Sequence, residues 1–258
     1  MPRSPDKTTT RGYDSAFHTT HWTEIFDARS ADEPRRREAL EHLLRRYWKP
    51  VYCYLRCKGY DRETAKDLTQ GFFCEVVLGR GLIEKADRAK GRFRTFLLTA
   101  LGRYTADVRR IEKAKRRTPE GGLVRLEGID GLKVPGHLHG ATPNEAFEYA
   151  WASSLLDHVL AEVAGKCRQR GSATHWEVFR ERVLQPIMEN AESPPLGRLC
   201  EKYGIPKKAK AATMLFTVKR NFRTVLRRHV RQFVASDAEV DDEISHLMRI
   251  FSRRAAIF

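Results

Sequence analysis

Hydrophobic residues recur every three or four positions along most of this chain, the spacing that places them on one face of a helix. The pattern is clearest from Gly91 to Arg117, where the face would consist of Phe93, Phe96, Leu97, Ala100, Leu101, Tyr104, Val108 and Ile111. Similar spacing predicts further helices over 35–55, 61–78, 142–170, 174–188, 196–203 and 207–234. Since no stretch alternates like a strand, the sequence predicts an all-α fold.

Local signals mark where several of these helices begin or bend. Asp61 is the expected N-cap of one helix, and Thr142-Pro143-Asn144-Glu145 predicts a capping box with proline in the first turn of another. Pro50 should kink the helix over 35–55 or start a second segment there. In the helix over 61–78, the expected inner face is Ala65, Leu68, Phe72 and Val76.

Composition divides the chain into two helical domains joined by a flexible linker. Residues 118–141 hold six glycines and two prolines, which is linker composition. The full expected order is a disordered N-terminus over 1–16, a first domain over 17–117, the linker over 118–141, a second domain over 142–235 and a C-terminal amphipathic helix over 236–258.

The second domain has the pattern of a helix-turn-helix. Gly204 allows a tight turn between a short helix over 196–203 and a long basic helix over 207–234. The apolar stripe of the long helix leaves a set of residues exposed in its N-terminal half, where they could reach a major groove: Lys207, Lys208, Lys210, Thr213, Met214 and Thr217.

Positive charge is concentrated rather than spread evenly. The formal net charge is +15, yet residues 85–117 and 207–231 each carry +9. The rest of the chain is therefore slightly acidic, and two basic segments indicate nucleic acid as the partner. A solvated basic face on an ordinary helix is the alternative for either segment taken alone.

Other kinds of chemistry have weak support in the sequence. Lys90-Gly91 reverses the order that a phosphate-binding loop requires, and Glu63, Asp67 and Glu75 are too far apart for a nuclease metal site. We therefore expect no enzymatic activity, metal or cofactor, although one zinc set is conceivable from His18, His21, Cys53 and Cys57.

The cysteine content and hydropathy indicate the compartment. Five cysteines, without a secretory signal, predict a reduced cytoplasmic protein. No apolar run approaches the length of about 20 residues that a membrane span needs.

These residues together resemble bacterial sigma-70-type RNA polymerase sigma factors, specifically the extracytoplasmic-function (ECF) group with two sigma domains. The resemblance covers roughly 17–251. The stretch from Asp61 to Phe73, DRETAKDLTQGFF, is similar to the family segment that contacts the polymerase. Residues 93–117 are similar to the region 2 segment that opens and reads the minus-ten element. Residues 196–231 are similar to region 4, which reads the minus-thirty-five element. Thr19-Thr20-His21-Trp22 and TVKRNFR, at 217–223, resemble a planctomycete-type subgroup.

The resemblance implies a region 2-like and a region 4-like domain with three sets of contact residues. Asp67, Gln70 and Phe73 would bind the clamp helices of the largest polymerase subunit. Minus-ten DNA would be bound by Arg92, Phe93, Arg94, Arg103, Asp107, Arg110 and Lys113. Minus-thirty-five DNA would be bound by Lys207, Lys208, Lys210, Thr213, Thr217 and Arg220.

The chain departs from the family pattern at two places. Arg103 stands where many members carry Asn, so the family's base preference at minus ten does not carry over. Ile205-Pro206-Lys207 replaces the commoner Ser-Glu-Gly turn, which leaves the register of the recognition helix open by a residue.

The sequence therefore predicts a transcription initiation factor that binds core RNA polymerase, including its flap, and promoter DNA. An anti-sigma factor is a further possible partner, and none of these contacts involves a membrane. The alternative is a helix-turn-helix regulator that binds DNA without the polymerase.

Overall fold

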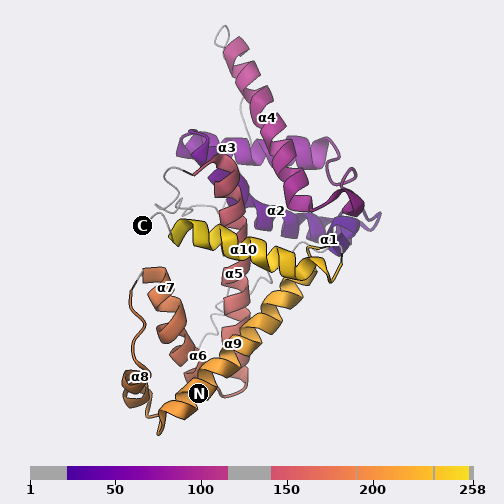
Figure 1. The fold of residues 1–258 in the computed structure, drawn as a ribbon. Coiled ribbons are helices and arrows are strands. Elements are labelled where there is room, and N and C mark those ends of the chain that lie inside the picture. The colour runs from indigo at the N-terminus through magenta and orange to yellow at the C-terminus, as the bar shows by residue number, and fades with distance from the viewer. Residues whose placement is uncertain (1–21, 116–140, 190, 235, 256–258) are drawn as a thin grey trace, which may run out of the picture.

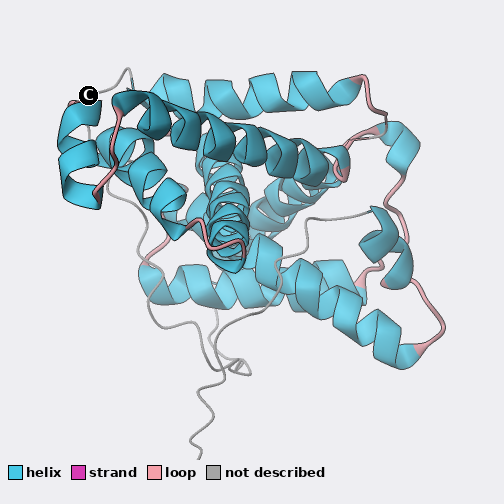
Figure 2. Ribbon diagram, turned by 90° about the horizontal axis from the view of Figure 1, so that it is seen from below, coloured by secondary structure: helices cyan, strands magenta, loops and turns pink. Residues whose placement is uncertain are grey.

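The protein is a set of packed helices in the computed structural model, which describes residues 22–115, 141–189, 191–234 and 236–255 (Figure 1). The α-helices are α1 (Trp22–Asp27), α2 (Glu33–Cys57), α3 (Arg62–Gly71), α4 (Phe93–Lys115), α5 (Pro143–Gln169), α6 (Ala173–Phe179), α7 (Gln185–Glu189), α8 (Leu196–Tyr203), α9 (Lys208–Arg231) and α10 (Glu239–Ala255). Shorter segments are the π-helical η1 (Phe72–Gly79) and η4 (Arg180–Leu184) and the 3-10 helix η2 (Arg88–Lys90). No strand occurs in the described residues, so the all-α prediction is confirmed (Figure 2).

Two predicted helix starts are confirmed by their hydrogen bonds. The Asp61 carboxylate accepts the backbone N–H groups of Glu63 and Thr64, each at 3.0 Å. Bonds from the hydroxyl and backbone of Thr64 also lower the pKa of Asp61. At the start of α5, Thr142 and Glu145 form the expected capping box, with the Thr142 N–H 2.9 Å from Glu145 Oε2. These caps satisfy backbone donors that the first helical turn leaves without partners.

Two other local predictions need correction. Helix α2 continues through Pro50, which is buried, so no second segment begins there. On α3, Leu68 is half-buried, whereas Thr69 is fully buried and its hydroxyl donates to the Ala65 carbonyl at 2.7 Å. This bond satisfies the hydroxyl inside the core, which is why a polar residue tolerates the inward position.

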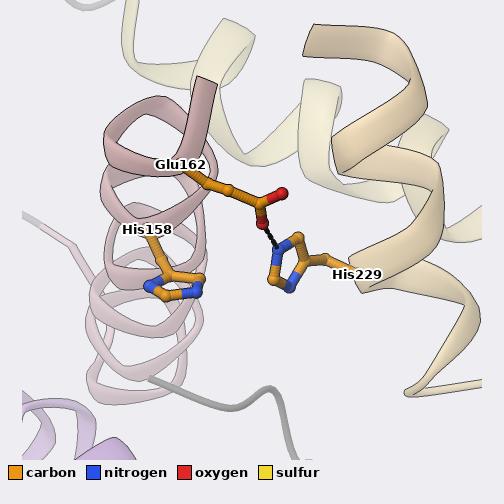
Figure 3. A group of neighbouring side chains, drawn as sticks. All are labelled: His158, Glu162 and His229. Carbon is orange, nitrogen blue, oxygen red and sulfur yellow. Dashed lines mark hydrogen bonds and ion pairs between the residues drawn. The ribbon is translucent and has the colours of Figure 1, made fainter. Parts of the chain in front are cut away.

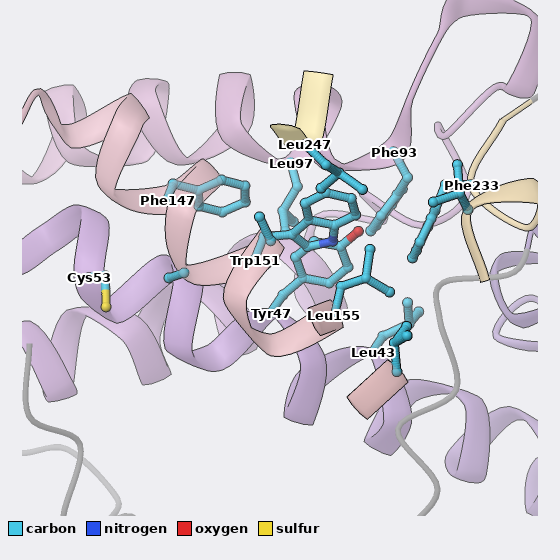
Figure 4. Packing of buried hydrophobic residues seen from close by; sticks show 14 of the residues in the cluster. Leu43, Tyr47, Cys53, Phe93, Leu97, Phe147, Trp151, Leu155, Phe233 and Leu247 are labelled. Atoms are coloured by element: carbon cyan, nitrogen blue, oxygen red, sulfur yellow. The ribbon is translucent and has the colours of Figure 1, made fainter. Parts of the chain in front are cut away.

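Helix α5 packs against both halves of the chain. Its N-terminal part lies on α2, where the rings of Tyr47 and Phe147 stack with centroids 6.4 Å apart. Farther along, Trp151 packs edge-on against Phe233 at 5.1 Å, and α5 also contacts α6, α9 and α10. Figure 4 shows Trp151 among side chains from α2, α4, α5 and α10.

The buried hydrophobic residues form one cluster that includes members of α1, α2, α4, α5, α8, α9 and α10. The predicted division into two domains on a flexible linker is therefore not confirmed, because α5 belongs to the core of both. Most of the predicted linker, residues 118–140, lies outside the described residues, as does the predicted disordered segment over 1–16.

None of the described helices combines the length and the apolar composition that crossing a membrane requires.

The shared core predicts that both halves unfold together. Trp151→Ala should lower the free energy of unfolding by about 3–5 kcal/mol, the usual effect of deleting a large buried side chain. The denaturation curve, followed by circular dichroism, should keep a single transition that shifts as a whole. Ile187→Ala, at an exposed position, is the control and should change stability by no more than about 0.5 kcal/mol. Two separate transitions, one of them unaffected by Trp151→Ala, would contradict the shared core.

Candidate nucleic-acid interface

Helices α8 and α9 are joined by the turn that the sequence predicts. Gly204 closes α8 in the left-handed conformation, with φ 62° and ψ 34°, which a residue without Cβ adopts without strain. The Ile205 N–H then donates to the Cys200 carbonyl at 2.8 Å, and the Ile205 side chain is buried beneath the turn. Lys207 occupies the N-cap position of α9 without a capping hydrogen bond from its side chain. A short helix, a tight turn and a long helix thus follow one another in the order that a helix-turn-helix requires.

The exposed side of α9 carries most of the residues assigned to minus-thirty-five DNA. Lys207, Lys208, Lys210, Thr213 and Arg220 are exposed, and Thr217 is half-buried. Their inward neighbours on the helix, Ala211, Leu215 and Val218, belong to the core. The helix therefore presents a basic and hydroxyl-bearing strip to solvent.

Met214 does not lie where the sequence pattern predicted, and an exposed aromatic residue that the sequence analysis did not assign lies beside the basic strip. Met214, predicted to be exposed, is buried. Phe216 is 64% exposed and stands on the strip together with Lys219 and Arg223. The spacing from Phe216 to Arg220 and Arg223 is the sequence signal that could have placed it on this face.

A groove of about 600 Å³ lies alongside the first half of α4. Its floor includes aromatic residues, among them Trp22, Phe96 and Tyr104. The cationic residues that line it are Arg80, Lys85, Lys90, Arg92 and Arg103, against one carboxylate among the lining residues, Asp87. Such a combination of positive charge and aromatic surface suits a nucleic-acid strand, whose phosphates are anionic and whose bases stack on rings. The sequence resemblance did not single out Arg80, Lys85 or Lys90.

The second half of α4 projects from the rest of the helices (Figure 1). Arg110 is exposed on it and pairs with Asp107 at 3.2 Å. Lys113 belongs to α4, but its side chain lies outside the described residues. Two residues assigned to minus-ten DNA, Asp107 and Arg110, therefore share this projecting part, and Arg103, which is exposed, lies just before it, where it also lines the groove.

The remaining minus-ten residues occupy a different environment. Phe93 is buried, and Arg94 is only 3% exposed. The Arg94 guanidinium lies 2.5 Å from Glu243 of α10, 3.2 Å from Glu148 of α5 and 4.2 Å from the centre of the Trp151 ring. In this conformation Arg94 is thus covered rather than presented on the surface, whereas Phe93, although buried, is among the residues that line the groove. Arg92, half-buried, pairs with the same Glu243 at 2.8 Å and also lines the groove.

Burial and ion pairing act in opposite directions on Arg94. Burial alone would lower its pKa, but the charges of Glu243 and Glu148 outweigh that effect and raise the pKa above the ordinary arginine value. The guanidinium is therefore a permanent buried cation that requires both carboxylates.

The residues assigned to the polymerase are only partly accessible. Asp67 is exposed on α3 and Gln70 is half-buried. Phe73 is buried and stacks on Trp48, with centroids 5.8 Å apart and planes 13° from parallel. The π-helical segment that begins at Phe72 turns Phe73 inward, since it changes the register between successive turns.

His158, Glu162 and His229 form a cluster that connects α5 to α9 (Figure 3). Their possible ligand atoms lie within 4.8 Å of one another, and two imidazoles with a carboxylate are ligands that suit zinc. Glu162 is already paired with Lys166 at 2.8 Å, with Arg228, and with His229 Nε2 at 2.8 Å. A metal ion would have to displace Lys166 and Arg228 from Glu162, so we infer that the cluster links the two helices.

The conceivable zinc set from the sequence is not assembled among the described residues. Cys53 is buried, and the Cys57 thiol donates to the Ala141 carbonyl, with Sγ 2.7 Å from the oxygen. His18 and His21 lie outside the described residues.

We compared the chain with known proteins, and it matches no protein-family model, no curated protein and no solved structure. We infer function from the residues and geometry of this chain, together with the resemblance carried by its sequence.

The Glu162 cluster predicts how stability depends on pH. Burial alone would raise the pKa of Glu162, but the hydrogen bonds from Lys166 and His229 and the charge of Arg228 lower it from 4.5 to about 2. Folding thus favours the carboxylate, so the stabilisation is present above pH 4.5 and is lost as the pH falls toward 2. Glu162→Gln should be less stable than the wild type at neutral pH by about 1.5–3 kcal/mol, the usual contribution of hydrogen bonds to a charged group.

Urea denaturation between neutral pH and pH 2 measures this difference, which should narrow once the pH falls below the ordinary carboxyl pKa. Glu38→Gln, at an exposed position of α2, is the control and should stay within about 0.5 kcal/mol of the wild type. A difference that remains constant over the whole range would show that the Glu162 charge does not stabilise the fold.

Proposed function

We propose that this protein is a sigma factor that binds core RNA polymerase, directs it to promoter DNA and assists opening of the duplex, with no catalysis of its own. The observation that carries the proposal is the presence in one chain of a basic, aromatic groove beside α4 and a helix-turn-helix with an exposed basic strip on α9. Two unlike DNA-binding features are what recognition of two promoter elements requires.

The groove suits a single strand better than a duplex. Cations along it would follow the phosphates, and half-buried Phe96 offers a ring on which an unstacked base can lie. Exposed Arg103 lines the same groove and extends it along α4. A strand held in this way would stabilise the open promoter and so promote melting at the minus-ten element.

The helix-turn-helix suits duplex DNA. The exposed N-terminal half of α9 would enter the major groove, with Thr213 and Thr217 near base edges and Lys207, Lys208 and Lys210 on phosphates. Arg220 stands farther along the same exposed strip. This helix would read the minus-thirty-five element.

The sequence resemblance alone supplies the polymerase as a partner. Asp67, exposed on α3, and Gln70 beside it would contact the clamp helices, while region 4-like residues would approach the flap. The proposal implies a cytoplasmic protein without a cofactor, and an anti-sigma factor is a compatible further partner.

A regulator that acts without the polymerase is the second candidate. The burial of Phe73 against Trp48 favours it, because this burial leaves two of the three expected clamp contacts at the surface. Binding to core polymerase therefore distinguishes the two candidates.

The first test concerns the groove. Replacing Arg80 and Arg103 with Ala should weaken binding of a single-stranded promoter oligonucleotide. The logarithm of the binding constant falls linearly with the logarithm of the salt concentration, and each lost phosphate contact should reduce the magnitude of this slope by about 0.7. Fluorescence anisotropy at several salt concentrations measures both quantities. The matched control is Arg168→Ala with Arg170→Ala, which removes the same charge from exposed positions at the end of α5. A groove variant with the wild-type slope would place the strand elsewhere.

The second test concerns the polymerase. Asp67→Lys combined with Gln70→Ala replaces an acidic contact by a misplaced cation, and core binding should weaken by several kcal/mol, roughly 2–5. Glu38→Lys, at an exposed position of α2, is the control for charge reversal. Thermal melting establishes that both variants are folded, and co-purification with core polymerase measures binding. If the folded double variant binds core as tightly as the wild type, the clamp does not dock on α3.

A further inference from the structure

The start of α10, together with the two residues before it, is an acidic segment. Residues 237–243, DAEVDDE, contain five carboxylates. Three of them pair with arginines of the two basic stretches: Asp237 with Arg231, Asp241 with Arg227, and Glu243 with both Arg92 and Arg94. The acidic segment thus connects α4 with α9, the two helices proposed to read DNA.

Glu243 holds its arginines in the way that a phosphate would. Its carboxylate is fully buried and lies 2.8 Å from Arg92 and 2.5 Å from Arg94. A carboxylate and a phosphate oxygen make the same charge-assisted contact with a guanidinium, so the two anions compete for one site. As long as Glu243 is in place, neither arginine has its full charge available for a DNA backbone.

The rest of α10 covers the same region by packing. Val240 and Leu247 are buried, and Phe251 packs edge-on against Tyr149 of α5 at 5.8 Å. The pairs with Arg227 and Arg231 are solvent-exposed and add little to this packing. The hold of α10 on α4 therefore depends on Glu243 and on the apolar face, and exposing Arg94 requires α10 to move away.

We propose that α10 is an autoinhibitory element, whose acidic segment occupies arginines of the DNA-binding surface and is displaced by the phosphates of promoter DNA. The inference rests on the proposed function, since it needs DNA as the competitor. Under this proposal the protein has a closed state, in which the acidic segment links α4 to α9, and an open state, in which Arg92 and Arg94 are available to phosphates.

A pair of single substitutions on adjacent residues tests the proposal. Glu243→Gln removes the carboxylate that holds Arg92 and Arg94. Asp242→Asn removes the same charge next to it, from an exposed side chain that makes no ion pair with any residue the structure describes. Glu243→Gln should bind a promoter duplex about tenfold more tightly than the wild type, within the usual range of coupling between sites. Its salt slope should steepen by about 0.9 for each additional phosphate that the variant neutralises, and Asp242→Asn should stay near the wild type.

Hydrogen exchange on the wild-type protein provides a second measurement that does not depend on the variant. With duplex bound, amides of α10 should exchange faster, while those of the buried middle of α5 should not. If Glu243→Gln fails to fold, this exchange measurement on the wild-type protein decides the proposal by itself.

The outcomes separate this inference from the proposed function. Tighter binding by Glu243→Gln alone, with faster exchange in α10, supports autoinhibition. Duplex binding that is equal in the wild type and both variants, with α10 still protected in the complex, overturns autoinhibition and leaves the sigma factor proposal intact. Weaker binding by Glu243→Gln also overturns it, because α10 would then support the DNA contact. If neither the wild type nor Glu243→Gln binds DNA, both proposals fail.

Discussion

The arrangement of this protein depends on a buried arginine. A guanidinium that leaves water loses a large solvation energy, which only well-placed anions and hydrogen bonds can offset. Arg94 of α4 meets that demand with Glu148 of α5, Glu243 of α10 and the face of Trp151. Three helices from distant parts of the sequence must therefore be in place together before this charge is tolerated.

Helix α5 connects the surroundings of Arg94 with the rest of the molecule through its contacts with other helices. Its capping box at Thr142 sets where the helix begins, and this start places Phe147 and Trp151 on α2 and Glu148 beside Arg94. Farther along, Glu162 fastens α5 to His229 of α9. One helix thus contacts both the half that bears the groove and the half that contains α8 and α9, and the buried residues of the two halves belong to one cluster.

The features that could be predicted from the sequence are those that depend on interactions between residues close together in the chain. Helix periodicity, the caps at Asp61 and Thr142 and the turn at Gly204 depend on neighbours within a few residues, and the structure has all of them. The exposure of Lys207, Lys208 and Lys210 follows from the same periodicity. For these parts of the fold, a short stretch of sequence is enough to predict the local structure.

Some errors arose where a distant partner decides the outcome. Arg94 is the kind of residue that usually lies at the surface, and its burial follows from acids on α5 and α10 far along the chain. Leu68 and Phe73 were misplaced for a local reason, because the π-helical segment that follows α3 and the hydrogen bond of the Thr69 hydroxyl alter which face turns inward. The groove residues Lys85 and Lys90 belong to the basic stretch that the charge distribution marks, but only the packing of the loop beside α4 brings them together.

Arg92 shows how the groove and the covered arginine are connected. Its side chain lines the groove and at the same time pairs with Glu243, so it stands at the boundary between accessible and buried charge. A phosphate that enters the groove reaches Arg92 first, without any opening of the core. Once Arg92 pairs with that phosphate, Glu243 remains paired with Arg94 alone. The network of ion pairs that stabilises the buried Arg94 is then weakened, starting from Arg92, its most exposed member. In the autoinhibition proposed above, displacement of α10 can therefore begin at the surface and proceed inward, so that DNA binding would not require a rare spontaneous exposure of Arg94.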